Sequence, residues 1–324
     1  MTTTQALIVP TNGGSDVLTV EERDISAPGP GQAQVRVAAA GVNFIDVYQR
    51  QGVYPIPTPF TLGMEGAGEV VAVGDGVDLA VGARVAWAMQ SGSAAGLVTI
   101  AADQLVPVPD GLDLDVAAAA MLQGMTAHYL VHSTYAVQPG DQCLVHAAAG
   151  GVGQLLVQLI VAKGAHVLAT AGSGDKLAIA ERLGAGTLIN YREEDIAQAV
   201  RAATDGLGVQ VAYDGVGRDT FDASLASLRT RGMLVLFGGA SGQVPAFDIQ
   251  RLNAAGSAYL TRPSLGAYLR TRAELLWRGS DILDALADGS LHLEIGGRWP
   301  LTEAASAYDA LESRQTTGKL LLIP

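Results

Sequence analysis

Short apolar runs, rich in β-branched residues, recur over the first third of the chain up to about Val108. They are separated by turn sequences such as Pro28–Gly31 and Gly74–Gly76, and this pattern predicts β-strands. A helix is predicted over Asn43–Gly52, and the proline-rich loop Tyr54–Pro59 after it either frames a cleft or crosses the surface. The predicted strands are Leu7–Val9, Leu18–Glu22, Ala33–Ala39, Gly68–Val73, Arg84–Ala88 and Leu97–Ile100.

From Gln142 onward the pattern changes, and strand-length apolar runs alternate with segments of helix length. Repeated units of this kind with short connections predict a parallel sheet that is covered by helices on both faces. The predicted strands are Cys143–Ala147, His166–Thr170, Thr187–Asn190, Val209–Asp214, Gly232–Phe237 and Ser257–Thr261. The predicted helices between them are Gly153–Lys163, Asp175–Leu183, Glu193–Ala203 and Asp219–Leu228.

The remaining segments indicate how the chain divides. A helical stretch over Asp113–Val131 leads into the alternating region, and after that region come the predicted helices Arg272–Ala287 and Leu301–Arg314 and a final strand Lys319–Ile323. We therefore expect an α/β protein: a β-rich domain from residues 1–126, a Rossmann domain with a doubly wound parallel sheet from residues 127–262, and a return to the first domain over residues 263–324.

Within Cys143–Gly153 the first strand of the alternating region runs into small residues, which precede the first helix. These residues have the spacing Ala148-x-Gly150-x-x-Gly153, with alanine in place of the first glycine of a dinucleotide-binding turn. Small residues there allow the backbone to approach a pyrophosphate, and the helix N-terminus then directs free N–H groups at it. On its own the match is also compatible with a turn that is merely tightly packed.

Composition narrows the function classes. The 324 residues are enough for two domains, and a net charge of −12 with a pI near 4.7 argues against a nucleic-acid or anionic-membrane surface. Cys143 is the only cysteine and forms no internal disulfide, which favours a cytoplasmic location. Residues 1–10 lack a signal pattern, and the apolar segment Leu155–Ala162 is too short to span a bilayer.

The turns after the later strands favour NADPH over NADH. An NAD site usually has a carboxylate at the end of the second strand, whereas Gly172 and Ser173 are small and Asp175 is better explained as a helix-start acid. Lys176 and Arg192 offer cations to a 2′-phosphate, although Arg192 can equally pair with a neighbouring glutamate. Further close-approach turns lie at Asp214–Gly217 and Phe237–Gly242, and Arg262 either faces the nicotinamide half or is structural.

With these turns placed, the chain resembles the zinc-free quinone oxidoreductases related to zeta-crystallin, within the medium-chain dehydrogenase/reductase superfamily. The resemblance covers essentially the whole chain and rests on Gly41–Tyr48, Gly63–Gly68, His146–Gly153, Ile189–Asp195, Tyr213–Thr220 and Leu260–Leu265. It implies that the β-rich domain is GroES-like, that NADPH binds between the two domains, and that the protein is a homodimer built through the Rossmann sheets.

Zinc-dependent relatives hold their catalytic metal with Cys, His and Cys or Glu. Here the first ligand position reads Asn43 and the Gly-His-Glu position reads Gly63-Met64-Glu65, which lacks the nitrogen and sulfur ligands that zinc prefers. The five histidines show no ligand spacing, and no four-cysteine loop is present. We therefore expect no metal.

The resemblance implies that a quinone or a related electrophile binds near Asn43, Tyr48 and Tyr54, the predicted catalytic residues, which could donate hydrogen bonds to a quinone oxygen. For the tyrosines the alternatives are a core-facing helix residue and a stacked loop residue. Asp46 is expected to orient a neighbour, and water is the expected proton source. The predicted cofactor contacts are Asn43, Asp46, Thr126, Tyr129, Gly150, Gly151, Val152, Gly172, Ser173, Lys176, Tyr191, Arg192, Val216, Phe237, Gly238, Gly239, Ser241, Leu260, Thr261, Arg262 and Lys319.

The main functional hypothesis is an NADPH-dependent quinone reductase, and the alternative is an NADPH-dependent reductase of activated C=C bonds in alkenals or enones. A nucleotide-binding regulator or single-stranded RNA binder belongs to a different class, and the net charge of −12 counts against RNA. A zinc alcohol dehydrogenase is the remaining possibility.

Overall fold

The protein is described here from a computed structural model, in which residues 2–313 and 316–324 are described. The chain divides into two units: Met1–Met125 together with Tyr268–Pro324, and Thr126–Ala267. The sequence places the domain boundaries after residues 126 and 262, whereas the units change after Met125 and Ala267.

Within the described residues, the first unit holds a three-stranded sheet of order β2-β1-β4 and a seven-stranded sheet of order β15-β16-β3-β5-β6-β8, with β7 also paired to β3. The strands are β1 (Thr2–Val9), β2 (Thr19–Ile25), β3 (Gln32–Val42), β4 (Phe60–Thr61), β5 (Glu65–Val73), β6 (Arg84–Ala88), β7 (Leu97–Ala101), β8 (Val106–Pro107), β15 (Ile295–Pro300) and β16 (Lys319–Ile323). The α-helices are α1 (Phe44–Arg50), α8 (Arg272–Ala287), α9 (Ala304–Glu312) and most of α2 (Leu114–Tyr129), which ends in the second unit.

The core of the first unit joins the two ends of the chain. Val42 on β3 pairs with Leu320 on β16, so the C-terminal strand is inserted beside a strand from the N-terminal part. Their buried side chains share one apolar cluster with Trp87 of β6 and Tyr308 of α9. Burial of this apolar surface is what returns residues 268–324 to the first unit.

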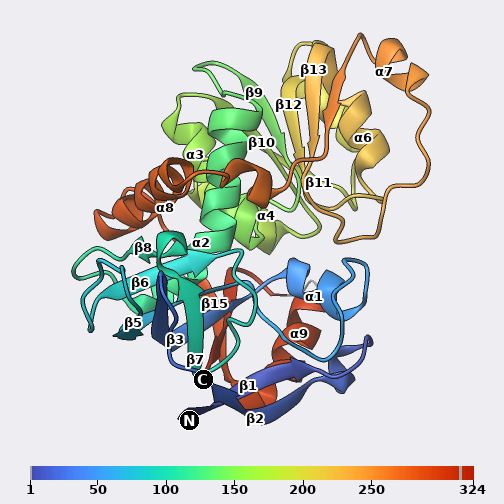
Figure 1. The fold of residues 1–324 in the computed structure, drawn as a ribbon. Helices are drawn as coiled ribbons and strands as arrows, with labels where there is room; N and C mark the ends of the chain where they lie inside the picture. The colour runs from blue at the N-terminus through green and yellow to red at the C-terminus, as the bar shows by residue number, and fades with distance from the viewer. Residues whose placement is uncertain (1, 314–315) are drawn as a thin grey trace. The chain divides into compact units, whose positions relative to one another are not determined.

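The second unit contains a parallel sheet, whose order within the described residues is β11-β10-β9-β12-β13-β14. Numbered from β9, this is the 3-2-1-4-5-6 order of a Rossmann fold, and the order reverses between β9 and β12. Its strands are β9 (Gln142–Val145), β10 (His166–Ala171), β11 (Thr187–Asn190), β12 (Val209–Asp214), β13 (Leu228–Leu236) and β14 (Tyr259–Thr261). Its helices are α3 (Gly151–Ala162), α4 (Gly174–Arg182), α5 (Ile196–Ala203), α6 (Phe221–Ala226) and α7 (Gln250–Ala254), several of which are seen against the sheet in Figure 1.

Several predicted elements differ from those observed. The helix predicted from Glu193 begins at Ile196, because Asp195 caps it by accepting a hydrogen bond from the Gln198 N–H. The helix predicted over Asp219–Leu228 is shorter, since β13 already begins at Leu228. Helix α7 and strand β15 were not predicted, and Arg314, the predicted end of the last helix, lies outside the described residues.

Other elements agree closely. The limits of α8 are those predicted, and its start is fixed by a capping box in which Thr271 and Glu274 exchange hydrogen bonds.

Cys143 is buried in β9, where desolvation raises the pKa of its thiol, so the side chain packs as a small apolar group. Over the described part of the chain, no helix combines the length and the apolar character needed to cross a membrane.

Candidate active site

The glycine-rich turn lies where β9 ends and α3 begins. Ala147 has a φ of 49°, and its carbonyl accepts a hydrogen bond of 2.8 Å from the Gly150 N–H. A Cβ on Gly153 would collide with that carbonyl, so only glycine permits this approach of helix to turn. Gly150, Gly151 and Val152 lie at the start of α3, where the first N–H groups of the helix have no intrahelical partner.

Small and cationic residues follow β10 and β11. Ser173 is the N-cap of α4, and Asp175 and Lys176 lie in the first turn of that helix. A Cβ on Gly172 would lie 2.6 Å from the Tyr191 hydroxyl, so the turn after β10 and the residue after β11 are close neighbours. Asp175 is exposed at a helix start, as predicted, and the end of β10 carries no carboxylate.

The turns after β12 and β13 contact each other. The Ser241 hydroxyl donates to the Val216 carbonyl at 2.8 Å and accepts from the Asp219 N–H at 3.0 Å. Gly238 is placed tightly against Gly215, where a Cβ would collide with the backbone. The structure thus brings together the predicted contacts Val216, Phe237, Gly238, Gly239 and Ser241.

The remaining predicted cofactor contacts of the second unit lie at its margins. Leu260 and Thr261 are half-buried on β14, and Arg262 is exposed directly after that strand. Thr126 and Tyr129 are buried on the last turn of α2.

In the first unit, a buried lysine lies between an amide and a carboxylate. The Lys319 ammonium donates to the Asn43 Oδ1 at 2.6 Å and pairs with the Glu65 carboxylate. Lys319 is 1% exposed and Glu65 is not exposed at all. The second Glu65 oxygen accepts a hydrogen bond of 2.5 Å from the Leu122 N–H, so the carboxylate is held from three sides. Gly41 is required beside it, because a Cβ there would collide with the carboxylate.

In this arrangement both the nitrogen and the oxygen of the Asn43 side-chain amide are hydrogen-bonded. Its Nδ2 donates to Glu65 Oε1 at 2.7 Å and to the Gly41 carbonyl at 3.3 Å, while its oxygen accepts from Lys319. Both amide hydrogens are therefore in use, and donation to a quinone oxygen would require one of these bonds to be given up.

Asp46 caps the start of α1. Its Oδ2 accepts hydrogen bonds from the Asn43 N–H at 2.9 Å and from the Tyr308 hydroxyl at 3.1 Å. Its Oδ1 is buried without a hydrogen-bond partner among the described residues. Burial raises the pKa of the Asp46 carboxyl to about 7, against the opposing effects of the Asn43 N–H and the Lys319 charge.

The two predicted catalytic tyrosines contact each other. The Tyr48 and Tyr54 rings meet edge-to-face with centroids 5.4 Å apart, and the Tyr54 N–H donates to the Tyr48 carbonyl. Tyr48 is half-buried, so it does not face the core fully, and Tyr54 is exposed. The stacked-loop description of Tyr54 therefore fits its contact with Tyr48.

The bonded side chains Asn43, Asp46, Glu65, Tyr308 and Lys319 form a buried group that we call the Asn43 cluster. Two of its residues, Glu65 and Tyr308, are not among the predicted site residues. The available signal for Glu65 was its place in Gly63-Met64-Glu65, at the position where zinc-dependent relatives hold a metal ligand, because acids are rarely buried without a partner. Nothing in the sequence around Tyr308 separates it from an ordinary core tyrosine.

Comparison with known proteins places the whole chain. Residues 29–137 match the alcohol dehydrogenase GroES-like domain, and residues 151–273 match the zinc-binding dehydrogenase family. The chain is 42% identical to a quinone oxidoreductase of Pseudomonas aeruginosa over 96% of this chain and 97% of that one. The chain belongs to the quinone oxidoreductase family of the medium-chain dehydrogenases/reductases.

Two further members of the comparison bear on chemistry. A 2-haloacrylate reductase of a Burkholderia species is 40% identical, with 98% of both chains covered. The crystal structure of the Escherichia coli quinone oxidoreductase complexed with NADPH superposes with a TM-score of 0.96 at 40% identity, covering 99% of this chain and all of that one. The Rossmann and GroES-like architecture expected from the sequence is confirmed.

Because one matching family is described as zinc-binding, the fit of a zinc ion to this member can be tested on its residues. The ligand positions hold Asn43, Met64 and Glu65, and the Lys319 ammonium already contacts two of these three side chains. A cation fixed there repels a metal ion, and a single carboxylate is too few donors. Within the described ranges, no group of three or more His, Cys, Asp or Glu residues could hold a metal. The residues do not fit a catalytic zinc.

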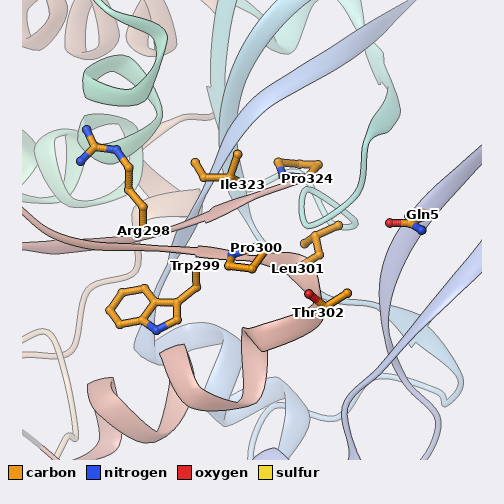
Figure 2. Close-up of a pocket in the computed structure, with 8 residues that line it drawn as sticks. All are labelled: Gln5, Arg298, Trp299, Pro300, Leu301, Thr302, Ile323 and Pro324. Atoms are coloured by element: carbon orange, nitrogen blue, oxygen red, sulfur yellow. The ribbon is translucent and has the colours of Figure 1, made fainter.

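The first unit also has a hollow of about 380 Å³ that is lined by other residues than those of the predicted site. Figure 2 shows most of its lining side chains at the ends of β15 and β16, with Gln5 of β1 opposite them and the Arg298 guanidinium turned away from the others. That guanidinium pairs with Asp115 at 2.6 Å. The hollow shares no residue with the Asn43 cluster and includes no predicted site residue.

Proposed function

We propose that this protein is an NADPH-dependent quinone reductase. The observation that carries the proposal is its similarity, over nearly the full length of both chains, to quinone oxidoreductases, one of which was solved with NADPH. The Rossmann strand order and the glycine turn at its switch point support a dinucleotide ligand.

The residues of the second unit fit the pyrophosphate of such a cofactor. Gly150 and Gly153 leave no side chain over the turn, and the twelve-residue helix α3 directs its N-terminal N–H groups and the positive end of its dipole there. The close pairs Gly172 with Tyr191 and Gly215 with Gly238 support backbone approach at the neighbouring strand ends as well.

Preference for NADPH is supported by the residues after β10 and β11. Ser173 and Lys176 at the start of α4, with Tyr191 and Arg192 after β11, offer hydroxyls and cations to a 2′-phosphate. No carboxylate ends β10 to accept a hydrogen bond from a ribose 2′-hydroxyl.

Bound NADPH would supply the hydride or electrons, and the chain's own residues would bind and orient the reactants. Lys319 and Glu65 fix the amide of Asn43, and Asp46 fixes its backbone. Tyr48 and Tyr54 supply aromatic surface for a planar acceptor, and their hydroxyls are suited to donating hydrogen bonds to a quinone oxygen as negative charge develops on it.

The alternative is reduction of an activated C=C bond, and the 2-haloacrylate reductase at 40% identity favours keeping it. Bound NADPH would supply the hydride for either reaction, and the same residues would bind and orient either acceptor. An RNA-binding role is opposed by the net charge of −12. A homodimer formed through the Rossmann sheets and a cytoplasmic location complete the proposal; they rest on the family resemblance and on the single cysteine.

The test compares NADPH and NADH oxidation with a panel of quinones and a panel of alkenals and 2-haloacrylates. We expect NADPH to be preferred and quinones to be reduced with the higher kcat/KM. Lys176→Ala should raise the KM for NADPH about ten-fold or more and leave that for NADH within about two-fold, as loss of a charge-assisted contact implies. Faster turnover of the alkenes would select the alternative, and equal losses for both cofactors would remove Lys176 from 2′-phosphate binding.

A further inference from the structure

A cluster of polar side chains is buried at the point where the strand order of the second unit reverses. His146 directly follows β9, Thr170 lies near the end of β10, and Asp214 ends β12. Thr220 directly precedes α6, and Ser224 lies within that helix. All five are buried. We call His146, Thr170, Asp214, Thr220 and Ser224 the switch-point cluster.

The hydrogen bonds of the cluster form one continuous chain. The Ser224 hydroxyl donates to Asp214 Oδ2 at 2.7 Å, so it accepts at 2.9 Å from His146 Nε2. The other ring nitrogen, Nδ1, then accepts from the Thr170 hydroxyl at 2.9 Å. This order assigns the neutral Nε2–H tautomer to His146, in agreement with burial, which lowers its pKa against the opposing charge of Asp214.

Serine, histidine and aspartate together suggest a hydrolytic triad, but the order of contacts excludes one. In a triad the histidine lies between serine and aspartate and removes the serine proton. Here Ser224 lies in the middle, gives its proton to Asp214 and receives one from His146. The cluster is also closed to solvent, so it holds groups in place and activates none of them.

The switch-point cluster holds the turns that follow β9 and β12. Asp214 Oδ1 accepts hydrogen bonds of 2.9 Å from the N–H groups of Val216 and Gly217, which shapes the turn after β12. On the other side, His146 directly precedes Ala147, whose φ of 49° is rare for a residue with a side chain. The Ser224 hydroxyl links these two sides through side chains, since it bonds both the histidine and the aspartate, and the His146 backbone N–H also donates to the Tyr213 carbonyl of β12 at 3.1 Å.

We propose that the switch-point cluster sets the relative positions of the turns after β9, β10 and β12, and that His146 and Ser224 are thereby positioning residues for the dinucleotide. Dinucleotides bind where the strand order reverses, so the cluster lies under the turns that must be in register. The inference rests on the proposed NADPH function for its binding consequence, whereas the positioning itself does not need a ligand.

The test uses two serines that differ in one respect. Ser224 and Ser227 are both fully buried at α6, but within the described residues the Ser227 hydroxyl donates to the Ala223 carbonyl of its own helix and links no two turns. Ser224→Ala should raise the Kd for NADPH, measured by fluorescence titration, about five-fold or more, while Ser227→Ala should change it less than about two-fold, as loss of one buried hydrogen bond implies. Equal Kd values for the two variants would overturn the inference.

Hydrogen exchange without NADPH separates this inference from the proposed function. Amides over residues 146–153 and 214–217 should exchange faster in Ser224→Ala than in Ser227→Ala, even if the wild-type protein binds no NADPH. Failure of wild-type binding would therefore end the proposed function alone, and unchanged exchange would end the positioning role alone.

A measurement on the wild-type protein covers the case in which Ser224→Ala does not fold. The ¹⁵N chemical shifts of His146 should report the neutral Nε2–H tautomer at pH 7, and Thr170→Val should shift Nδ1 while leaving Nε2 protonated. A doubly protonated ring, or the Nδ1–H tautomer, would contradict the hydrogen-bond order on which the cluster depends.

Discussion

Lys319 is the residue on which the buried cluster of the first unit depends. Its ammonium is the counter-ion of Glu65 and fixes the amide of Asn43 at the same time. In the zinc-dependent relatives a metal supplies positive charge at the corresponding ligand positions, and here a side chain supplies it. The charge belongs to the chain itself and pairs with a buried carboxylate, so it contributes to folding as well as to the site.

Removing the charge of Lys319 should therefore destabilise the folded protein. Lys319→Met leaves the Glu65 carboxylate buried without a counter-ion, which should lower the free energy of unfolding by about 3–5 kcal/mol. The double variant Lys319→Met/Glu65→Gln should recover a large part of the loss, because it removes both charges. Urea denaturation of the three proteins measures the effect, and a double variant less stable than Lys319→Met would contradict it.

An exposed pair in the same unit provides the control. Arg23 and Glu21 on β2 form an ion pair at 2.8 Å with side chains 45% and 41% exposed. Arg23→Met should cost at most about 1 kcal/mol, because water and salt screen such pairs.

Asp46 should make stability depend on pH. The folded protein holds the pKa of this carboxyl at about 7, above the ordinary value of 3.8. Below about pH 4 the carboxyl is protonated in both states. Between about pH 4 and pH 7 only the folded state keeps the proton, so stability falls as pH rises, by up to about 1.4 kcal/mol per pH unit. The contribution is fully present at low pH and is lost as pH passes the folded pKa.

Asp46→Asn removes this titration while keeping an acceptor for the Asn43 N–H. We expect the thermal midpoint of the wild-type protein to fall more steeply from pH 5 to pH 8 than that of Asp46→Asn. Asp175→Asn, which changes an exposed carboxylate in α4, is the control and should follow the wild-type slope. Parallel slopes for wild type and Asp46→Asn would show that Asp46 is already ionised in the folded state.

At the scale of elements, what the sequence predicts well depends on where the deciding contacts lie. The strand His166–Ala171 and the helix Arg272–Ala287 are determined by their own apolar runs and caps, and the pattern found them nearly to the residue. Strand β15, Ile295–Pro300, alternates between half-buried and exposed positions and contains two glycines, so it has no apolar run to recognise. It is a strand because it pairs with β16.

The same distinction applies to the candidate site. The turn at Gly150–Gly153 could be predicted because close backbone approach demands small residues in sequence. The contact of Lys319 with Asn43 joins residues 276 positions apart, and that of Ser224 with His146 joins residues 78 apart. No local pattern encodes such pairs, because each residue alone is compatible with an ordinary core or surface position.

At the scale of the whole molecule, the edge strand β14 of the second unit's parallel sheet is a candidate surface for pairing with another copy of the chain. Within the described residues, β14 pairs with β13 on one side and ends the sheet on the other. Edge strands present unpaired N–H and C=O groups, and the Tyr259 side chain on β14 is 59% exposed. If two copies pair through β14, the β14 edge of each copy is covered by the other copy. We propose this arrangement for the dimer.

A like charge placed on that edge meets itself across a two-fold axis, so Tyr259→Lys should weaken the dimer. Sedimentation velocity at micromolar concentration should give about twice the 33.3 kDa chain mass for the wild type and a monomer-enriched distribution for Tyr259→Lys. Leu207→Lys is the control, because Leu207 is 70% exposed but lies in the turn before β12 and not on β14. If the wild type sediments as a monomer, or if Leu207→Lys dissociates as readily as Tyr259→Lys, the dimer does not form through this edge.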